Sequence, residues 1–98
     1  MLSGKQRRHL RSLAHPLRPL VHLGKGGIDT GVVAAVDQAL TDHELIKVRV
    51  GEHMELDRHA AADALALQTK SLVAQVLGNV VLLYRAHPEK PQIVLPRR

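Results

Sequence analysis

The hydrophobic and polar residues of this chain follow two periods, and the switches between them outline seven elements. Apolar residues recur every three or four positions over about 4–14, 30–42 and 55–69, which predicts three helices. Short apolar or alternating runs predict four strands, at 19–23, 45–50, 71–77 and 80–85. The order αβαβαββ predicts a two-layer α/β (α+β) domain, with three helices packed on a four-stranded mixed sheet.

The first helix separates its apolar and charged residues into two stripes. Ser3 is a suitable N-cap, and the step from His15 to Pro16 ends the helix. At helical spacing, the inward stripe consists of Gln6, Leu10, Leu13 and Ala14. The opposite stripe contains no acid and consists of Lys5, Arg7, Arg8 and Arg11. Solvated helix faces usually mix both signs of charge, so this stripe favours a polyanion as partner.

Two further elements have a face that the pattern predicts. In strand 45–50, the residues expected in the core are Ile46, Val48 and Val50, while Lys47 and Arg49 point to the opposite side. In the alanine-rich third helix, the expected inner face consists of Leu56, Ala60, Ala64 and Leu67.

Charge is concentrated towards the two ends of the 98-residue chain. Residues 1–28 contain six Lys or Arg and no acid. Residues 29–78 contain four Lys or Arg and eight acids, and residues 79–98 contain four Lys or Arg and one acid. Because the termini of small domains often lie close together, we expect one basic face opposite an acidic body. Such a face suits a nucleic acid.

Composition limits the class of protein. The chain has no cysteine, no secretory h-region and no apolar run near the ~20 residues of a membrane span, so we expect a single cytoplasmic domain over residues 1–98. Tyr84 is the only aromatic residue and is expected in the core or at a sheet edge. This excludes recognition of bases by aromatic stacking and leaves phosphates, 2′-hydroxyls and shape.

A glycine-rich loop follows the first predicted strand and contains Gly24, Lys25, Gly26 and Gly27. Its spacing fits neither a Walker loop nor a GxGxxG dinucleotide loop, and about 0.5 GxxG matches are expected by chance in a chain with seven glycines. Its context is more informative, because a lysine lies at its tip and a helix N-terminus follows. Glycines there would let backbone amides approach an RNA backbone, as in KH domains.

Candidate catalytic chemistry is weak. The seven histidines lack the i, i+4 spacing of a helical metal site, and no nucleophile or carboxylate pair stands out. We therefore expect no cofactor, no metal and no enzymatic activity. A nuclease that depends on His15 or His22 is the least favoured hypothesis.

Four stretches together resemble the YhbY family, the bacterial single-domain form of the CRM (chloroplast RNA splicing and ribosome maturation) domain. They are LAHPLRPLVHLGKGG at 13–27, HELIKVRV at 43–50, VLGNVVLLYR at 76–85 and LPRR at 95–98. The resemblance implies a fold related to the C-terminal domain of translation initiation factor three, with a KH-like GxxG loop. It also implies binding of structured RNA, with bacterial members associating with large ribosomal subunit precursors. The RNA-binding residues it implies are Gly24, Lys25, Gly26, Gly27, Lys5, Arg7, Arg8, Arg11, Arg18 and Arg85.

The chain departs from the family at one position, where Lys70 replaces the glycine that often follows the third helix. If that position needs a positive φ, lysine is strained there, and the helix could end differently. Another difference is from KH domains, whose loop joins two helices, so equivalence of mechanism is an analogy.

The leading hypothesis is a monomeric, non-enzymatic protein that binds ribosomal RNA during large-subunit assembly. The alternative is a module that docks on a ribosomal protein or assembly factor through its acidic middle, near residues 37–44 and 52–57.

Overall fold

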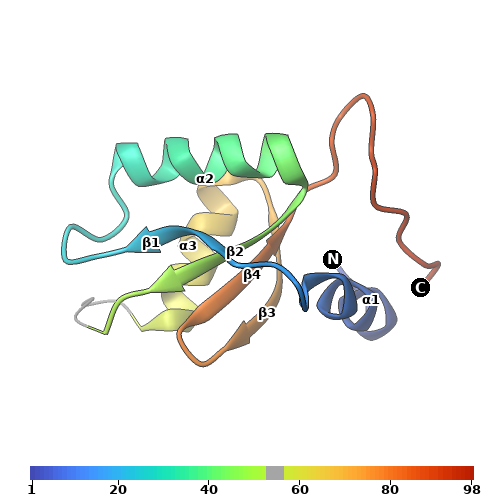
Figure 1. Cartoon of the computed structure of the whole chain (residues 1–98), viewed down its shortest axis with the longest axis horizontal. Coiled ribbons are helices and arrows are strands. Elements are labelled where there is room, and N and C mark those ends of the chain that lie inside the picture. Colours follow the sequence, from blue (N-terminus) through green and yellow to red (C-terminus); the bar gives the residue numbers. More distant parts are fainter. Residues whose placement is uncertain (53–56) are drawn as a thin grey trace.

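The computed structural model describes residues 1–52 and 57–98, and its elements follow the predicted order αβαβαββ (Figure 1). They are α1 (Gly4–Ala14), β1 (Pro19–Leu23), α2 (Thr30–His43), β2 (Leu45–Val50), α3 (Arg58–Thr69), β3 (Leu72–Leu77) and β4 (Val80–Tyr84). The predicted fold class is therefore confirmed. No helix in the described ranges combines the length and the apolar character that crossing a bilayer requires.

The sheet has four strands in the order β1-β2-β4-β3. β1 and β2 are parallel because α2 crosses between them, whereas β2–β4 and β4–β3 pair antiparallel. The β3–β4 connection contains Gly78 at φ 57°, a conformation that glycine adopts without strain. The sheet is therefore mixed, as the sequence predicts.

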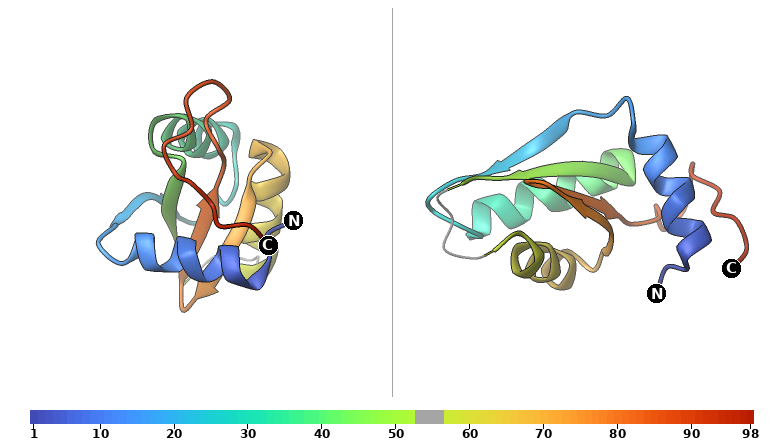
Figure 2. Two further views of the ribbon diagram at one scale, coloured as in Figure 1. Left: turned by 90° about the vertical axis from the view of Figure 1, so that its right-hand side faces the viewer. Right: turned by 90° about the horizontal axis from the view of Figure 1, so that it is seen from below.

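Apolar residues form one cluster on each face of the sheet. The larger cluster joins α2 and α3 to the strands and includes Val36, Leu40, Ile46, Val48, Leu65 and Leu83. The smaller cluster lies under α1 and includes Leu10, Ala14, Leu45, Leu82 and Tyr84. α1 thus adds a partial layer on the second face of the sheet, at one end of the molecule (Figure 2).

α3 differs from the prediction in its start and in its buried face. The helix begins at Arg58, because Asp57 is extended and its carboxylate caps the amides of His59 and Ala60. The predicted start near residue 55 was too early, and Leu56 lies outside the described residues.

The buried residues of α3 are Ala61, Ala62, Leu65 and Thr69, whereas Leu67 is 81% exposed. The predicted inner face was therefore wrong for Leu67, and Ala60 and Ala64 are only half-buried. Alanines on every side of this helix make its apolar stripe too weak to define one face.

α3 ends at Thr69, and Lys70 follows in the left-handed conformation with φ 55° and ψ 41°. The Lys70 amide donates to the Ala66 carbonyl, which closes the last turn. Position 70 therefore has a positive φ, which the glycine often found there in the family would adopt without strain. Lysine takes this position at a cost of about 1–2 kcal/mol relative to an unstrained backbone.

The C-terminal segment, residues 86–98, runs without regular structure back to α1, so that the two termini lie close together as expected (Figure 2). The Gln6 side chain donates to the Pro96 carbonyl at 3.1 Å, and the Arg98 guanidinium donates to the Met1 carbonyl at 3.2 Å. Ile93 and Leu95 pack against the smaller apolar cluster.

Glu44 anchors this segment to the body of the domain. It is only 3% exposed, and its carboxylate accepts the amides of His87, Gln92 and Ile93 at 2.7, 2.7 and 3.0 Å. Burial opposes ionisation, but these three hydrogen bonds outweigh it and lower the pKa of Glu44. Its φ of 64° is unusual for a non-glycine residue, and its own amide and carbonyl are both hydrogen-bonded.

Candidate nucleic-acid interface

Charge is divided between the two faces of the sheet. α1 and the four strands contain no Asp or Glu, and their cations are Lys5, Arg7, Arg8, Arg11, Lys47 and Arg49. The opposite layer carries Asp37 and Asp42 on α2 and Asp63 on α3. The folded chain therefore has one layer whose charges are all positive, and a phosphate backbone would meet no repulsion from α1 or the strands.

The four cations of α1 are exposed, whereas Leu10 and Ala14 of the same helix are buried. Ser3 and Gln6 form a capping box that begins this helix. Its first turn holds no acid, so Lys5 lies where the helix dipole disfavours a positive charge. The helix dipole therefore favours Arg11, in the last turn, but does not account for Lys5.

The loop at residues 24–27 is a tight turn in which the Gly27 amide donates to the Gly24 carbonyl at 3.0 Å. Lys25 is exposed at its tip. Among the described residues, no acceptor lies within hydrogen-bond reach of the Lys25 or Gly26 amide. Two backbone donors are thus free for an anionic ligand.

Of the three loop glycines, the fold requires glycine only at Gly27. Gly27 has a φ of 68°, which the turn itself demands. A Cβ at Gly24 would have no atom within 4 Å, and one at Gly26 would come no closer than 3.7 Å, to Asp29 Oδ2. The fold therefore tolerates side chains at Gly24 and Gly26, and the absence of side chains there leaves room for a close external contact.

Asp29 changes the expected role of the helix N-terminus next to the loop. Its carboxylate caps α2 by accepting the Val32 amide at 2.8 Å. A negative side chain already occupies this end of α2, so the helix dipole is largely compensated. The free amides of the loop, rather than the helix N-terminus, remain as the anion-binding groups.

Gly51 holds the base of the loop against the sheet. Its amide donates to the Leu23 carbonyl at 2.8 Å, and a Cβ at this position would lie only 2.6 Å from that oxygen. The backbone following β2 therefore passes close to the point where the loop begins. This contact requires glycine at position 51.

The loop and α1 lie at opposite ends of the molecule (Figures 1 and 2). The principal extents of 38 × 26 × 24 Å make this the long direction of the domain. Arg18 lies exposed in the connection between α1 and β1, at the α1 end. The fold thus does not bring the loop next to the basic helix, and the predicted site consists of two separate parts.

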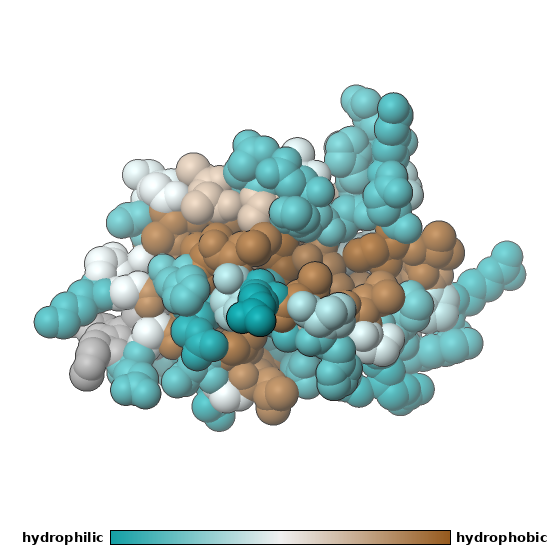
Figure 3. Space-filling view, viewed as in Figure 1, coloured by the Kyte–Doolittle hydropathy of each residue, from teal (hydrophilic) through white to brown (hydrophobic). Residues whose placement is uncertain are grey.

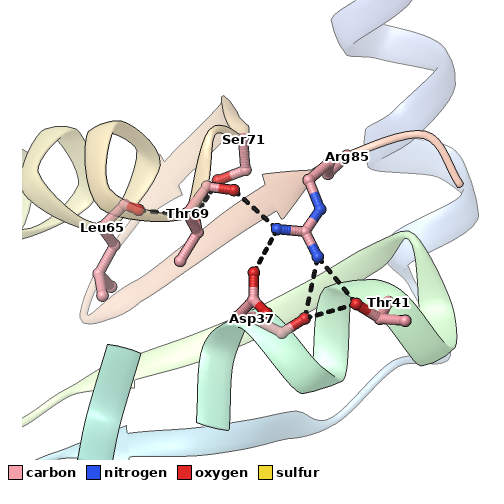
Figure 4. Close-up of polar contacts among 6 residues, drawn as sticks. All are labelled: Asp37, Thr41, Leu65, Thr69, Ser71 and Arg85. Carbon is pink, nitrogen blue, oxygen red and sulfur yellow. Dashed lines mark hydrogen bonds and ion pairs between the residues drawn. The ribbon is translucent and has the colours of Figure 1, made fainter. Parts of the chain in front are cut away.

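Arg85 has a structural role, because all four of its terminal N–H groups are used (Figure 4). Nη1 donates to Asp37 Oδ1 at 2.6 Å and to the Thr69 carbonyl at 2.7 Å. Nη2 donates to the Asp37 carbonyl and to Thr41 Oγ1, each at 3.0 Å. The guanidinium joins α2 to the end of α3, and we do not include it in the proposed RNA surface.

Two cations of this layer, Lys47 and Arg49, were not among the RNA-binding residues expected from the sequence. Lys47 and Arg49 lie on the face of β2 opposite buried Val48, and His22 pairs with Arg49 in the sheet register. The alternation in strand 45–50 contained this signal. Tyr84, by contrast, is buried in the smaller apolar cluster as expected, and burial raises its pKa.

His15 and His22 are both exposed. No group of three His, Asp or Glu side chains within the described ranges is arranged to hold a metal ion.

Residues 2–85 match the model of the CRS1 / YhbY (CRM) domain. The chain is 43% identical to the probable RNA-binding protein YqeI of Bacillus subtilis over 96 residues, which is 98% of this chain and 100% of the relative. It is 40% identical over 97 residues to a protein of Haemophilus influenzae named RNA-binding protein, covering 99% of this chain and 97% of the relative.

The fold is also found in a solved structure. The solution structure of SAV1595 from Staphylococcus aureus superposes with a TM-score of 0.83 at 42% identity, over 98% of this chain and 100% of that chain. Family model, relatives and fold agree over nearly the whole length. The chain belongs to the CRS1 / YhbY (CRM) domain family.

Proposed function

We propose that this chain is a non-enzymatic RNA-binding protein that binds structured ribosomal RNA and assists assembly of the large ribosomal subunit. The observation that carries the proposal is the acid-free layer formed by α1 and the strands, opposite the acids of α2 and α3. The naming of relatives at 40–43% identity as RNA-binding proteins supports it. The ribosomal assignment rests on the family resemblance of the sequence.

The proposed contacts are the loop at residues 24–27 and the basic side chains around α1. At the loop, the free amides of Lys25 and Gly26 and the Lys25 ammonium would bind phosphate oxygens. At the other end, the contacts would come from Lys5, Arg7, Arg8, Arg11 and Arg18. Phosphates, 2′-hydroxyls and shape would dominate recognition, because the single aromatic side chain is buried.

A charge reversal at the loop tests the proposal. Lys25→Glu should weaken binding of ribosomal RNA by about ten-fold or more, because it replaces a phosphate contact by repulsion. Lys70→Glu is the matched control, since Lys70 is equally exposed but follows α3 in the other layer. Both affinities are measured by titration at one salt concentration. Equal losses at the two positions would contradict the assignment of the loop.

The ribosomal assignment has its own test. Crosslinking in cells, followed by sequencing of the bound RNA, should recover large-subunit ribosomal RNA and its precursors. Recovery of other RNAs alone would overturn this part of the proposal while leaving RNA binding intact.

The second candidate function is docking on a ribosomal protein or assembly factor. Part of the acidic middle expected to serve it, at residues 53–56, lies outside the described residues, and the observation that favours docking concerns a different surface. A groove of about 380 Å³ at the α1 end is lined mainly by apolar side chains, among them Leu13, Leu17, Leu20 and Ile93. Figure 3 shows apolar residues in a band across this side of the molecule. A docking module would have little intrinsic affinity for purified ribosomal RNA, whereas the RNA binder would show a steep fall in affinity with rising salt.

A further inference from the structure

The surface between the loop and α1 is the open face of the sheet. α1 covers this face at one end only, through Leu10 and Ala14. Towards the loop, the face is uncovered, and Leu77 is 68% exposed. The two parts of the proposed RNA site are thus the two ends of one continuous sheet surface (Figure 2).

Cations continue along this face. Val48 and Val50 point into the larger apolar cluster, so Lys47 and Arg49 point to the open side. They are two residues apart on one strand, which separates their Cα atoms by about 7 Å. His22 lies in register with Arg49 on the neighbouring strand, and Lys25 follows three residues later in the loop.

A hollow of about 430 Å³ forms where this face meets α1. Arg11 and His15 line it from the α1 side, and Lys47 and Gln75 line it from the sheet. Lys47 is held in place because its Nζ donates to the Leu17 carbonyl at 3.1 Å. The basic side chains of α1 are therefore joined to those of β2 without an intervening acid among the residues that line the hollow.

The chemistry of this face fits an RNA backbone. Its charged side chains are the cations Lys47 and Arg49, which can donate to phosphates, and the remainder, such as Leu77 and Val80, is apolar and suited to contact with ribose. No Phe, Tyr or Trp side chain is exposed on it to hold a splayed base. The complementary ligand is a run of phosphates and sugars rather than a single nucleotide.

We propose that the open sheet face is a third RNA contact, along which one RNA strand runs from α1 to the loop with its phosphates on Lys47 and Arg49. This inference rests on the proposed function, since it concerns the path of the same RNA. It implies that loop and helix act on one RNA molecule, and that an RNA too short to span the face engages only one end.

Arg49→Ala tests the path, because Arg49 is exposed and makes no hydrogen bond or ion pair within the described residues. Arg58→Ala is the matched control, since Arg58 is exposed on α3 in the opposite layer. We expect Arg49→Ala to weaken binding of a structured ribosomal RNA by about three- to ten-fold and to reduce the slope of log affinity against log salt by about 0.7–0.9. Arg58→Ala should change neither quantity, and both variants should keep the thermal unfolding midpoint of the parent.

A comparison of two RNA lengths shows whether the loop and α1 bind the same RNA. Arg11→Ala at the α1 end and Lys25→Glu at the loop should both weaken binding to a long RNA, whereas to an oligonucleotide of about four nucleotides, too short to reach from α1 to the loop, only one of them should matter.

The outcomes separate this inference from the proposed function. If Lys25→Glu weakens binding but Arg49→Ala does not, the RNA leaves the domain by another path and this inference fails alone. If neither variant changes the affinity, RNA binding through this layer fails as well. If neither variant changes RNA affinity and Arg49→Ala instead abolishes binding of an acidic protein, the face is a protein-docking surface and both the inference and the proposed function are overturned.

Discussion

The two faces of the sheet differ in how far helices cover them. The face under α2 and α3 is fully covered and holds the largest buried side chains, including Leu40, Ile46 and Leu65. The face under α1 is covered at one end and left open at the other, where its exposed side chains include Arg49 and Leu77. Most of the buried apolar side chains lie on the α2 and α3 side, so part of the other face remains exposed and can bind a ligand.

The two sides of the sheet also differ in the signs of their charged residues. On the covered side, the helices carry charges of both signs, and Arg85 is paired with Asp37 at 2.6 Å. On the open side, the cations of α1 and β2 have no acid on their own elements. Charges that satisfy one another contribute to the fold, whereas unmatched charges of one sign point to an external partner.

The largest expected effect concerns Glu44, which joins the C-terminal segment to the covered side. Glu44→Gln should lower the free energy of unfolding by about 1–3 kcal/mol, because one amide oxygen replaces a buried carboxylate that accepts three backbone amides. Chemical denaturation at neutral pH measures this loss. An unchanged stability would show that the segment is held by Ile93 and Leu95 instead.

The pH dependence of the same variant sharpens this prediction. Since the folded-state pKa of Glu44 lies below its ordinary value of 4.5, its stabilisation is complete above that pH and is lost as pH falls below it. The difference in stability between the parent and Glu44→Gln should therefore shrink on acidification.

Alanine substitutions in the loop should affect stability at one glycine and RNA binding at the other two. Gly27→Ala should lower stability by about 1–2 kcal/mol, because alanine is strained at a φ of 68°. Gly24→Ala and Gly26→Ala should leave the unfolding midpoint nearly unchanged, since a Cβ fits there, and should weaken RNA binding by obstructing the backbone amides. Thermal unfolding and RNA titration separate the two effects. Unchanged RNA affinity in both of the latter variants would show that the amides make no close contact.

The smallest expected effect is at Lys70. Lys70→Gly should raise the free energy of unfolding by about 0.5–1 kcal/mol, because glycine adopts the left-handed conformation without strain. RNA affinity should stay the same, since Lys70 belongs to the covered side. Weaker RNA binding by this variant would break the separation of the two faces.

Much of the fold was predictable because its signals are local. Ser3 with Gln6 marks the start of α1, the alternation in strand 45–50 separates core from surface, and Gly78 with Asn79 marks the hairpin. The buried face of α3 was not predictable in this way, because alanines on every side of the helix leave contacts with other elements to decide which side is buried. Leu65 is buried and Leu67 exposed, although both are leucines two residues apart.

The candidate site was predictable in its composition but not in its layout. Arg85 counts as a free cation in the sequence, yet the fold surrounds its guanidinium with four acceptors from α2 and α3. Lys47 and Arg49 look like ordinary strand residues, yet they lie on the surface that joins loop and helix. Both outcomes depend on contacts between residues far apart in the chain.

The sequence by itself determined the order of the elements, the cap of α1, the acid-free basic helix and the lysine at the tip of a glycine loop. These follow from periods of a few residues, which backbone geometry converts directly into structure. Only the tertiary structure decided that the loop and α1 lie at opposite ends, that an open sheet face connects them, and that Glu44 ties the C-terminal segment to the body. Those relations depend on how the layers pack, which no local period encodes.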